Sequence, residues 1–273
     1  MPDELLIQRA GWRPTPLVAA SIALHGVALV LLLWRPTWWP QLVALVLLNH
    51  LLLTGCGLLP RSRWLGPNLT RLPAAAAARN EIAITIDDGP DPAVTPVVLD
   101  ILDRFHARAT FFCIGAKAEA HADLCREIVR RGHSVENHSQ RHRHNFAFMG
   151  RAGFRRELQQ AQETFGHITG RRPSFFRAPA GLRNPLLDPV LHELGLRLAS
   201  WTRRGYDTRT SDPDILLQRL TDGLRAGDIL LLHDGNSART AAGTPAVLEV
   251  LPRLLECTVA AGLRPVTLTA ACA

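Results

Sequence analysis

The sequence is poor in several features that mark common protein classes. Its 273 residues include one tyrosine, two methionines and five cysteines. The cysteines lack metal-binding spacing, which excludes a cysteine-rich zinc module, and this odd, scattered set favours free, mostly buried thiols in a reducing compartment. No internal repeat occurs, and the one low-complexity tract is Ala74 to Ala78. We therefore expect a single globular catalytic or binding domain with an accessory segment rather than a repeat array.

Lysine is nearly absent, since Lys117 is the only one, yet arginine brings the formal net charge to +7. A basic chain can bind nucleic acid, but here the basic residues are spread along expected helices rather than gathered with aromatic residues, and no nucleic-acid-binding motif occurs. We therefore expect no nucleic-acid partner. Anionic membrane lipid beside a basic region explains the same charge, and lipid phosphate or pyrophosphate could use it too.

Two hydrophobic stretches, residues 17–34 and 41–59, are each about long enough to cross a bilayer. The residues between them, 35–40, are expected to form a tight turn, and Trp34, Trp38 and Trp39 suit an interfacial aromatic belt. We predict a transmembrane helical hairpin over residues 1–60. The alternative is a signal peptide followed by a core helix, but the first stretch is long for a signal segment and no small-residue cleavage site follows it.

Polar residues lie near the middle of both stretches. His25 lies in the first, and Asn49 and His50 lie in the second. At equal depth in an antiparallel pair they could hydrogen-bond to each other, which would remove the cost of lone polar groups in hydrocarbon.

The arginines predict an orientation. Arg9 and Arg13 precede the first stretch and Arg35 is alone in the turn, whereas four arginines follow the second stretch: Arg61, Arg63, Arg71 and Arg79. The positive-inside rule then places both ends on the cytoplasmic side of a bacterial inner membrane. A competing pattern is the lipobox-like segment Leu53 to Cys56, which would anchor the protein outside that membrane. A lipobox follows one short signal segment, whereas this segment lies beyond two apolar stretches.

After a linker rich in proline, alanine and arginine, residues 61–80, strand and helix patterns alternate over residues 81–273. Such alternation predicts an α/β domain with a parallel sheet. The expected strands are Ile82 to Ile86, Ala109 to Ile114, His133 to Glu136, Ser174 to Arg177, Leu196 to Trp201, Asp228 to Leu232 and Arg264 to Leu268.

Two adjacent acids, Asp87 and Asp88, end the first expected strand and precede Gly89 and Pro90. Consecutive side chains there point in different directions, so one carboxylate can bind a metal while the other accepts a proton from metal-bound water. By itself, however, such a run is usually only a turn.

His138 and His142 are spaced i and i+4, which places both rings on one face if the backbone makes a helical turn. The alternative is an exposed face of an arginine-rich helix. With Asp88 they would give three ligands and an open position, the arrangement of a catalytic zinc site. His144 is a less favoured ligand, because a third imidazole would crowd the open position.

Two further segments complete the pattern: Arg177 to Gly181 follows an apolar pair, and His233 ends the apolar run that begins at Leu230. In this order and spacing the motifs resemble those of NodB-type polysaccharide deacetylases, carbohydrate esterase family four, over about residues 80–268. The resemblance implies a distorted barrel of seven βα units with its chemistry at the carboxyl ends of the strands.

The resemblance also implies roles for individual residues. The general base would be Asp87, oriented by Arg177 through a charge-assisted hydrogen bond. The general acid would be His233, whose pKa the carboxylate of Asp207 would raise. The backbone N–H of Ala180 would stabilise the oxyanion. The implied metal ligands are Asp88, His138 and His142, with zinc as the default ion and cobalt or nickel fitting the same geometry.

The chain departs from the family pattern where relatives wall the sugar-binding groove. Ala180 replaces a common aromatic residue, Thr208 replaces a tryptophan, and Arg204 replaces an acidic residue. The catalytic residues are thus retained while the substrate surface is rebuilt, which makes a standard chitin or xylan substrate less expected.

Two functional hypotheses follow. The favoured one is a membrane-anchored, metal-dependent hydrolase of a linear amide, which removes an acetyl or formyl group from an amino sugar of an envelope polysaccharide or lipid-linked glycan precursor. The alternative is a catalytically silent glycan-binding or scaffold protein that keeps the fold. Retention of the base, the three ligands, Arg177 and His233 favours the hydrolase.

Overall fold

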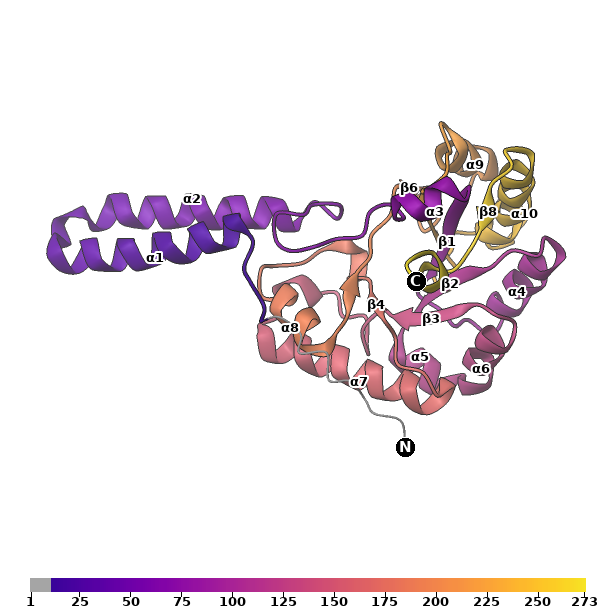
Figure 1. The fold of residues 1–273 in the computed structure, drawn as a ribbon, viewed down its shortest axis with the longest axis horizontal. Coiled ribbons are helices and arrows are strands. Elements are labelled where there is room, and N and C mark those ends of the chain that lie inside the picture. Colours follow the sequence, from indigo (N-terminus) through magenta and orange to yellow (C-terminus); the bar gives the residue numbers. More distant parts are fainter. Residues whose placement is uncertain (1–10) are drawn as a thin grey trace.

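The computed structural model describes residues 11–273. Arg9, one of the arginines used for the orientation, lies outside the described residues. A long two-helix hairpin projects from one side of an α/β body (Figure 1).

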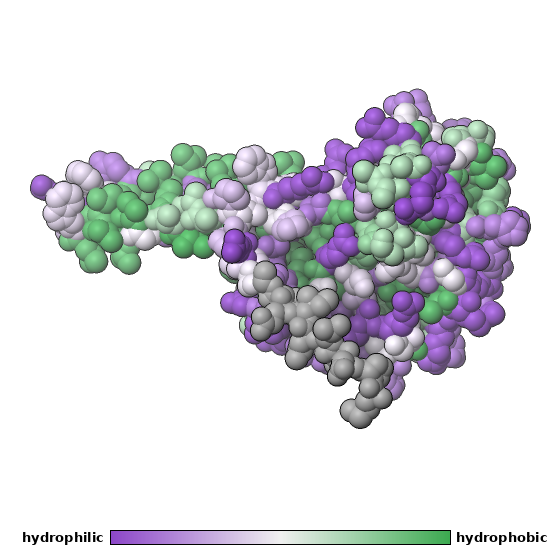
Figure 2. Space-filling model, in the orientation of Figure 1, coloured by the Kyte–Doolittle hydropathy of each residue, from purple (hydrophilic) through white to green (hydrophobic). Residues whose placement is uncertain are grey.

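The hairpin consists of α1 (Pro16–Trp34), a short 3-10 helix, η1 (Pro36–Trp38), and α2 (Trp39–Gly57). Thr15 starts α1, because its side chain accepts a hydrogen bond from the Val18 N–H. Both helices are long and apolar enough to cross a membrane, and most of their hydrophobic side chains are exposed. Figure 2 shows this apolar surface along the hairpin and a more polar body. The prediction of two long apolar helices is confirmed.

Polar residues pair across the hairpin as expected. His25 Nε2 lies 3.2 Å from His50 Nε2, and Asn49 Nδ2 donates to Ser21 Oγ at 2.8 Å. The first pair was predicted; the partner of Asn49 is Ser21 rather than His25. These contacts hold the two helices in antiparallel register and leave the polar groups paired at the depth where a bilayer would offer no water.

The body is built on a parallel sheet with strand order β5-β4-β3-β2-β1-β7-β6. In addition, β8 pairs with the first two residues of β1. The strands are β1 (Glu81–Asp87), β2 (Ala109–Cys113), β3 (Ser134–Asn137), β4 (Phe175–Phe176), β5 (Arg197–Leu198), β6 (Arg203–Arg204), β7 (Ile229–His233) and β8 (Arg264–Pro265). Seven of them lie at the predicted positions, several in shortened form. The sequence did not predict β6, because two arginines carry no apolar strand signal. The distorted α/β barrel is confirmed.

Helices surround the sheet and supply the rest of the core (Figure 1). They are α3 (Ala74–Ala78), α4 (Thr95–Arg104), α5 (Gly115–Ala120), α6 (Ala122–Arg130), α7 (Arg151–Thr169), α8 (Leu187–Leu194), α9 (Pro213–Thr221), α10 (Ala246–Ala260) and α11 (Leu268–Ala271), with the 3-10 turns η2 (Phe146–Phe148) and η3 (Pro179–Gly181). Every residue of β1 and β7 is buried, because helices cover both strands. This rigid centre fixes the positions of the polar residues at the strand ends.

The segment after α2 packs against the body. Leu72 and Ala76 are buried in its core, and the Leu69 N–H donates to Leu198 O at 2.9 Å. The segment predicted as a linker therefore lies along the barrel over much of its length.

The hairpin is attached at its base by several polar contacts. Trp12 Nε1 donates to Asp188 Oδ2 at 2.7 Å, and Thr15 Oγ1 donates to Trp64 O at 2.6 Å. The Arg183 N–H donates to Gly57 O at 3.2 Å. A Cβ at Gly57 would collide with the Arg183 carbonyl oxygen, so glycine is required for this close approach. The hairpin therefore has a defined position on the body.

Candidate active site

The candidate site lies where β1 and β7 end side by side. Asp87 and His233 are register partners on these adjacent strands, so both side chains reach the same edge of the sheet. Asp88 follows in a left-handed conformation, with φ 74°, and this turns its side chain away from that of Asp87. The turn supports the predicted difference in direction between the two carboxylates.

Asp88, His138 and His142 form the one potential metal-binding group found among residues 11–273. The Oδ1 atom of Asp88 lies 3.2 Å from the Nε2 atom of each histidine. This oxygen is buried and has no hydrogen-bond donor within the described part of the chain. An unpaired buried carboxylate oxygen facing two imidazole nitrogens fits a bound divalent cation, because a cation would satisfy all three atoms at once.

The two histidines do not lie on a helical turn, so that part of the expectation is wrong. Residues 138–143 form an irregular loop in which Ser139 and His142 adopt positive φ values of 65° and 47°. Asn137 Oδ1 accepts from the Ser139 N–H at 2.8 Å, and Ser139 Oγ accepts from the His142 N–H at 2.9 Å. These side chains replace the helical hydrogen bonds and bring the rings together, with centroids 4.8 Å apart.

Neighbouring groups orient the three ligands. His138 Nδ1 donates to Arg177 O at 2.8 Å, which leaves Nε2 free to face Asp88. Asn236 Nδ2 donates to Asp88 Oδ2 at 2.9 Å, and Lys117 Nζ donates to the Asp88 carbonyl at 2.7 Å. The sequence did not point to Asn236 or Lys117, because each lies in a different segment and neither forms a spaced pattern with the ligands.

Charge and burial set the protonation of the ligands. Burial opposes ionisation of Asp88, but the close approach of His138, with His233 and His142 nearby, outweighs it and holds the pKa of Asp88 well below its usual value. Burial, with the nearby His138 charge, lowers the pKa of His142 to about 4. Near neutral pH the site thus offers an ionised carboxylate and a neutral imidazole, the forms that bind metal.

Asp87 and Arg177 form the predicted pair. Arg177 NH1 donates to Asp87 Oδ1 at 2.6 Å and to Thr85 Oγ1 at 2.7 Å. Its other nitrogens donate to the carbonyls of Ala199 and Ser200. The Arg177 side chain is 1% exposed, and its guanidinium carbon lies 4.1 Å from the Phe112 ring centroid. Four hydrogen bonds on a buried cation fix the direction in which it presents Asp87.

His233 and Asp207 form the second predicted pair. Asp207 Oδ1 lies 2.8 Å from His233 Nδ1, and Oδ2 accepts from the His233 backbone N–H at 2.7 Å. Burial lowers the pKa of His233, but the Asp207 carboxylate, aided by Asp87 and Asp88, reverses this effect and raises it above the ordinary value. Nδ1 is committed to Asp207, so Nε2 is the ring atom available to a substrate.

Six of the predicted site residues line a cavity of about 320 Å³: Asp87, Asp88, His138, His142, Ala180 and His233. Ala180 lies on its wall in the turn η3 with φ 53°, next to Gly181. His144 also lines the cavity but lies outside the potential metal group. The rest of the wall includes Trp201, Arg204, Thr208, Arg209 and Asn236. Arg177 and Asp207 do not line this cavity, but each is hydrogen-bonded to a residue that does, Asp87 and His233 respectively.

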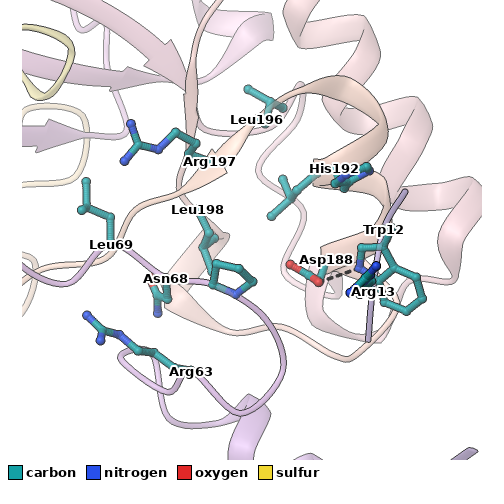
Figure 3. Close-up of a pocket in the computed structure, with 12 residues that line it drawn as sticks. Trp12, Arg13, Arg63, Asn68, Leu69, Asp188, His192, Leu196, Arg197 and Leu198 are labelled. Carbon is teal, nitrogen blue, oxygen red and sulfur yellow. Dashed lines mark hydrogen bonds between the residues drawn. The ribbon is translucent and has the colours of Figure 1, made fainter. Parts of the chain in front are cut away.

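A second cavity, of about 530 Å³, lies at the base of the hairpin between the segment before α1, the loop after α2, and α8 with β5. Figure 3 shows Trp12 bonded to Asp188 on one side, with Arg63 and Asn68 across the opening. Burial raises the pKa of Asp188 above its usual value. No lining residue of this cavity is shared with the first, so we interpret it as part of the contact between hairpin and body.

Comparison with known proteins gives consistent matches. Residues 74–199 match a family model described as polysaccharide deacetylase. A chitooligosaccharide deacetylase from Azorhizobium caulinodans is 38% identical over 167 residues, which cover 59% of this chain and 78% of the relative. A peptidoglycan-N-acetylglucosamine deacetylase from Bacillus cereus is 31% identical over 175 residues, which cover 63% and 81%.

The fold has solved counterparts. The crystal structure of the Bc1960 peptidoglycan N-acetylglucosamine deacetylase, in complex with an N-hydroxybenzamide compound, superposes with a TM-score of 0.68 at 24% identity. The match covers 75% of this chain and 92% of that one.

Proposed function

The chain belongs to the polysaccharide deacetylase family, carbohydrate esterase family four, and is a glycan deacetylase; on that premise we propose a metal-dependent, membrane-anchored enzyme. Its substrate is an amino sugar of an envelope polysaccharide or lipid-linked glycan precursor, from which it removes an N-acetyl or N-formyl group. The observation that carries the proposal is the buried, unpaired Oδ1 atom of Asp88, which faces two imidazole nitrogens in the cavity that Asp87 and His233 also line.

Asp88, His138 and His142 hold one divalent cation, with zinc as the default for a carboxylate and two imidazoles and with cobalt or nickel as alternatives. When bound, such a cation lowers the pKa of water and polarises an amide carbonyl. The remaining residues of the cavity then orient the substrate and move protons.

Asp87 acts as general base and accepts a proton from the attacking water. Arg177 keeps the carboxylate ionised and aimed into the cavity through the 2.6 Å hydrogen bond. The backbone N–H of Ala180 donates to the oxygen of the tetrahedral intermediate. His233, oriented by Asp207, gives its Nε2 proton to the departing nitrogen, which leaves as an amine while the acyl group leaves as acetate or formate.

The hairpin, residues 1–60, anchors the enzyme as two membrane spans, residues 61–80 connect it to the body, and residues 81–273 form the catalytic domain. The arginine distribution supports a catalytic domain on the cytoplasmic face of the inner membrane. Alkaline phosphatase fused to the carboxyl end tests this orientation, because it is active only after export. Silence of the phosphatase, with fluorescence from a matched fluorescent-protein fusion, supports a cytoplasmic domain; strong phosphatase activity supports a periplasmic one.

Two asparagine substitutions separate metal binding from proton transfer. Asp88→Asn should lower both the metal content of the purified protein and the release of acetate. Asp87→Asn should keep the metal, because the three ligands remain, but lower the rate of acetate release by about 100-fold or more. Asp123→Asn is the matched control, since that carboxylate is exposed on α6.

Metal content is measured by mass spectrometry and acetate by an enzyme-coupled assay on N-acetylated oligosaccharides. Undiminished acetate release by Asp88→Asn protein would refute the metal-dependent mechanism. Absence of acetate and formate from wild-type protein across a broad panel of neutral and phosphorylated amino sugars would favour the silent glycan-binding alternative.

A further inference from the structure

The active-site cavity carries two arginines that the proposed chemistry does not use. Arg204, on β6, and Arg209, in the loop that follows, both line the cavity beside the metal ligands. Within residues 11–273, neither side chain makes a hydrogen bond or an ion pair, and Arg204 Nε is buried without an acceptor. A buried guanidinium nitrogen without an acceptor is costly unless a ligand supplies one.

Other arginines of the same region have partners. Arg203 Nε donates to Asp228 at 2.7 Å, and Arg219 donates to Gly205 O and Thr210 Oγ1. Arg177 makes the four hydrogen bonds already described. The buried nitrogen without an acceptor is therefore particular to Arg204, and Arg209 adds an exposed cation to the same cavity.

Aromatic rings hold Arg204 in place without neutralising it. Its guanidinium carbon lies 5.3 Å from the Trp201 ring centroid and 4.9 Å from that of Tyr206. Stacking restricts the side chain while the edge of the guanidinium keeps its N–H donors available. Such a preorganised planar donor suits two oxygens of one phosphate group.

The cavity wall that carries Arg204 is in contact with the base of the hairpin, where α2 ends. Gly181 lies between Pro60 and Trp201, so closely that a Cβ at Gly181 would come 2.6 Å from the Pro60 Cβ and 2.7 Å from the Trp201 ring. Ser200 Oγ donates to Pro60 O at 2.6 Å, and Arg61 donates to Thr202 O at 3.2 Å. Because α2 ends three residues before Pro60, this wall of the cavity lies beside the end of a proposed membrane span.

We infer that the substrate is an N-acylated amino sugar joined through phosphate to a membrane lipid, and that Arg204 and Arg209 bind the phosphate oxygens while the acylamino group faces the metal site. This inference rests on the proposed function and specifies its substrate. It accounts for two features of this wall: the buried Arg204 nitrogen without an acceptor and the direct contact between the wall and the hairpin.

The test compares three N-acetylglucosamine substrates with the purified full-length protein in detergent: a neutral chitooligosaccharide, N-acetylglucosamine 1-phosphate, and the same sugar linked through phosphate to a polyprenyl chain. The readout is the ratio of kcat/KM for each phosphorylated substrate to that for the neutral one. The variants are Arg204→Gln, Arg209→Gln and the double substitution. Arg126→Gln, an exposed residue of α6, is the charge-matched control, and Arg204→Lys keeps the charge without the planar donors.

The expected ratio is well above one for the lipid-linked substrate in wild type. In the double variant this ratio should fall by at least about tenfold, chiefly because KM for the lipid-linked substrate rises. Arg126→Gln should keep the wild-type ratio, and the ratio for Arg204→Lys should lie between those of Arg204→Gln and wild type. A merely structural role for the arginines would reduce turnover of neutral and phosphorylated substrates equally, and that outcome overturns the inference.

The remaining outcomes are also decisive. Acetate release from the neutral sugar alone refutes phosphate recognition while the proposed deacetylase stands. Equal, arginine-dependent turnover of the free sugar phosphate and the lipid-linked sugar supports phosphate binding and refutes the need for lipid. Acetate release from none of the three refutes both the inference and the activity it rests on.

Discussion

Replacement of Arg177 by methionine should destabilise the protein strongly. The side chain is fully buried and its guanidinium makes four hydrogen bonds, one of them to Asp87. Methionine fills part of the volume but leaves the Asp87 carboxylate buried without its cation. It also leaves the hydroxyl of Thr85 and two backbone carbonyls without their donor.

The magnitude follows from the burial of the pair. Removal of one partner from a buried ion pair costs about 3–5 kcal/mol, because the other charge remains out of water. For a domain of this size, about 2–4 °C of melting temperature corresponds to each kcal/mol. We therefore expect Arg177→Met to melt about 6–20 °C below wild type.

Thermal unfolding in detergent measures this effect. Arg177→Lys keeps the charge near Asp87 but not the planar donor set, so its melting temperature should lie between those of Arg177→Met and wild type. Arg126→Met, which breaks an exposed ion pair with Asp123, should lower the free energy of unfolding by less than about 1 kcal/mol. A melting temperature of Arg177→Met within about 2 °C of wild type would refute the reasoning.

Three further predictions concern the hairpin, the core and the proposed general acid. Gly57→Ala should loosen the hairpin from the body and expose their junction to limited proteolysis, whereas Gly55→Ala, in the same helix but facing open space, should not. Burial, together with nearby arginine charge, lowers the pKa of His133 from 6.5 to about 4, so the unfolded chain binds a proton that the folded one excludes. The free energy of unfolding of wild type should therefore fall by about 3 kcal/mol as pH falls from about 6.5 to 4, and that of His133→Asn should fall by less over that range. Asp207→Asn should lower the pKa of His233 and move the alkaline limb of the pH–rate profile to lower pH.

Each of these has a contrary outcome. Equal protease sensitivity of the two alanine variants would show that the Gly57 contact does not hold the hairpin. Parallel stability–pH curves for wild type and His133→Asn would show that this histidine does not titrate as its burial requires. An unchanged alkaline limb in Asp207→Asn would assign that limb to another group.

The positions of two proposed catalytic residues, Asp87 and His233, could be located from the sequence because each ends a strand signal. The runs that end at Asp87 and His233 are buried over their whole length, and parallel strands bring their carboxyl ends to one edge of the sheet. The resemblance to a known family then related these segments to His138 and Arg177, which lie far away in the chain.

The geometry of the histidine loop could not be predicted in the same way. Spacing of i and i+4 suggested a helical turn, but hydrogen bonds from Asn137 and Ser139 stabilise an irregular loop with positive φ values. Such local side-chain competition leaves no periodic signal in a sequence. The short strand β6 was missed for a related reason, since the pairing of Arg203 and Arg204 with β7 depends on a neighbour rather than on their own propensity.

The contact between hairpin and body likewise needed the structure. Gly57 and Gly181 are unremarkable in the sequence, yet both are required where backbone or proline approaches closely. The two unpaired arginines of the cavity could be recognised only after every other partner had been placed.

The central claim is that a single divalent cation at Asp88, His138 and His142 is required for deacylation. The most direct measurement is acetate release by full-length protein stripped with a chelator and then titrated with zinc. We predict that activity is lost on stripping, rises linearly with added zinc and reaches a plateau at one equivalent per chain. Full activity in the stripped protein, with its metal content shown to be negligible, would contradict the account.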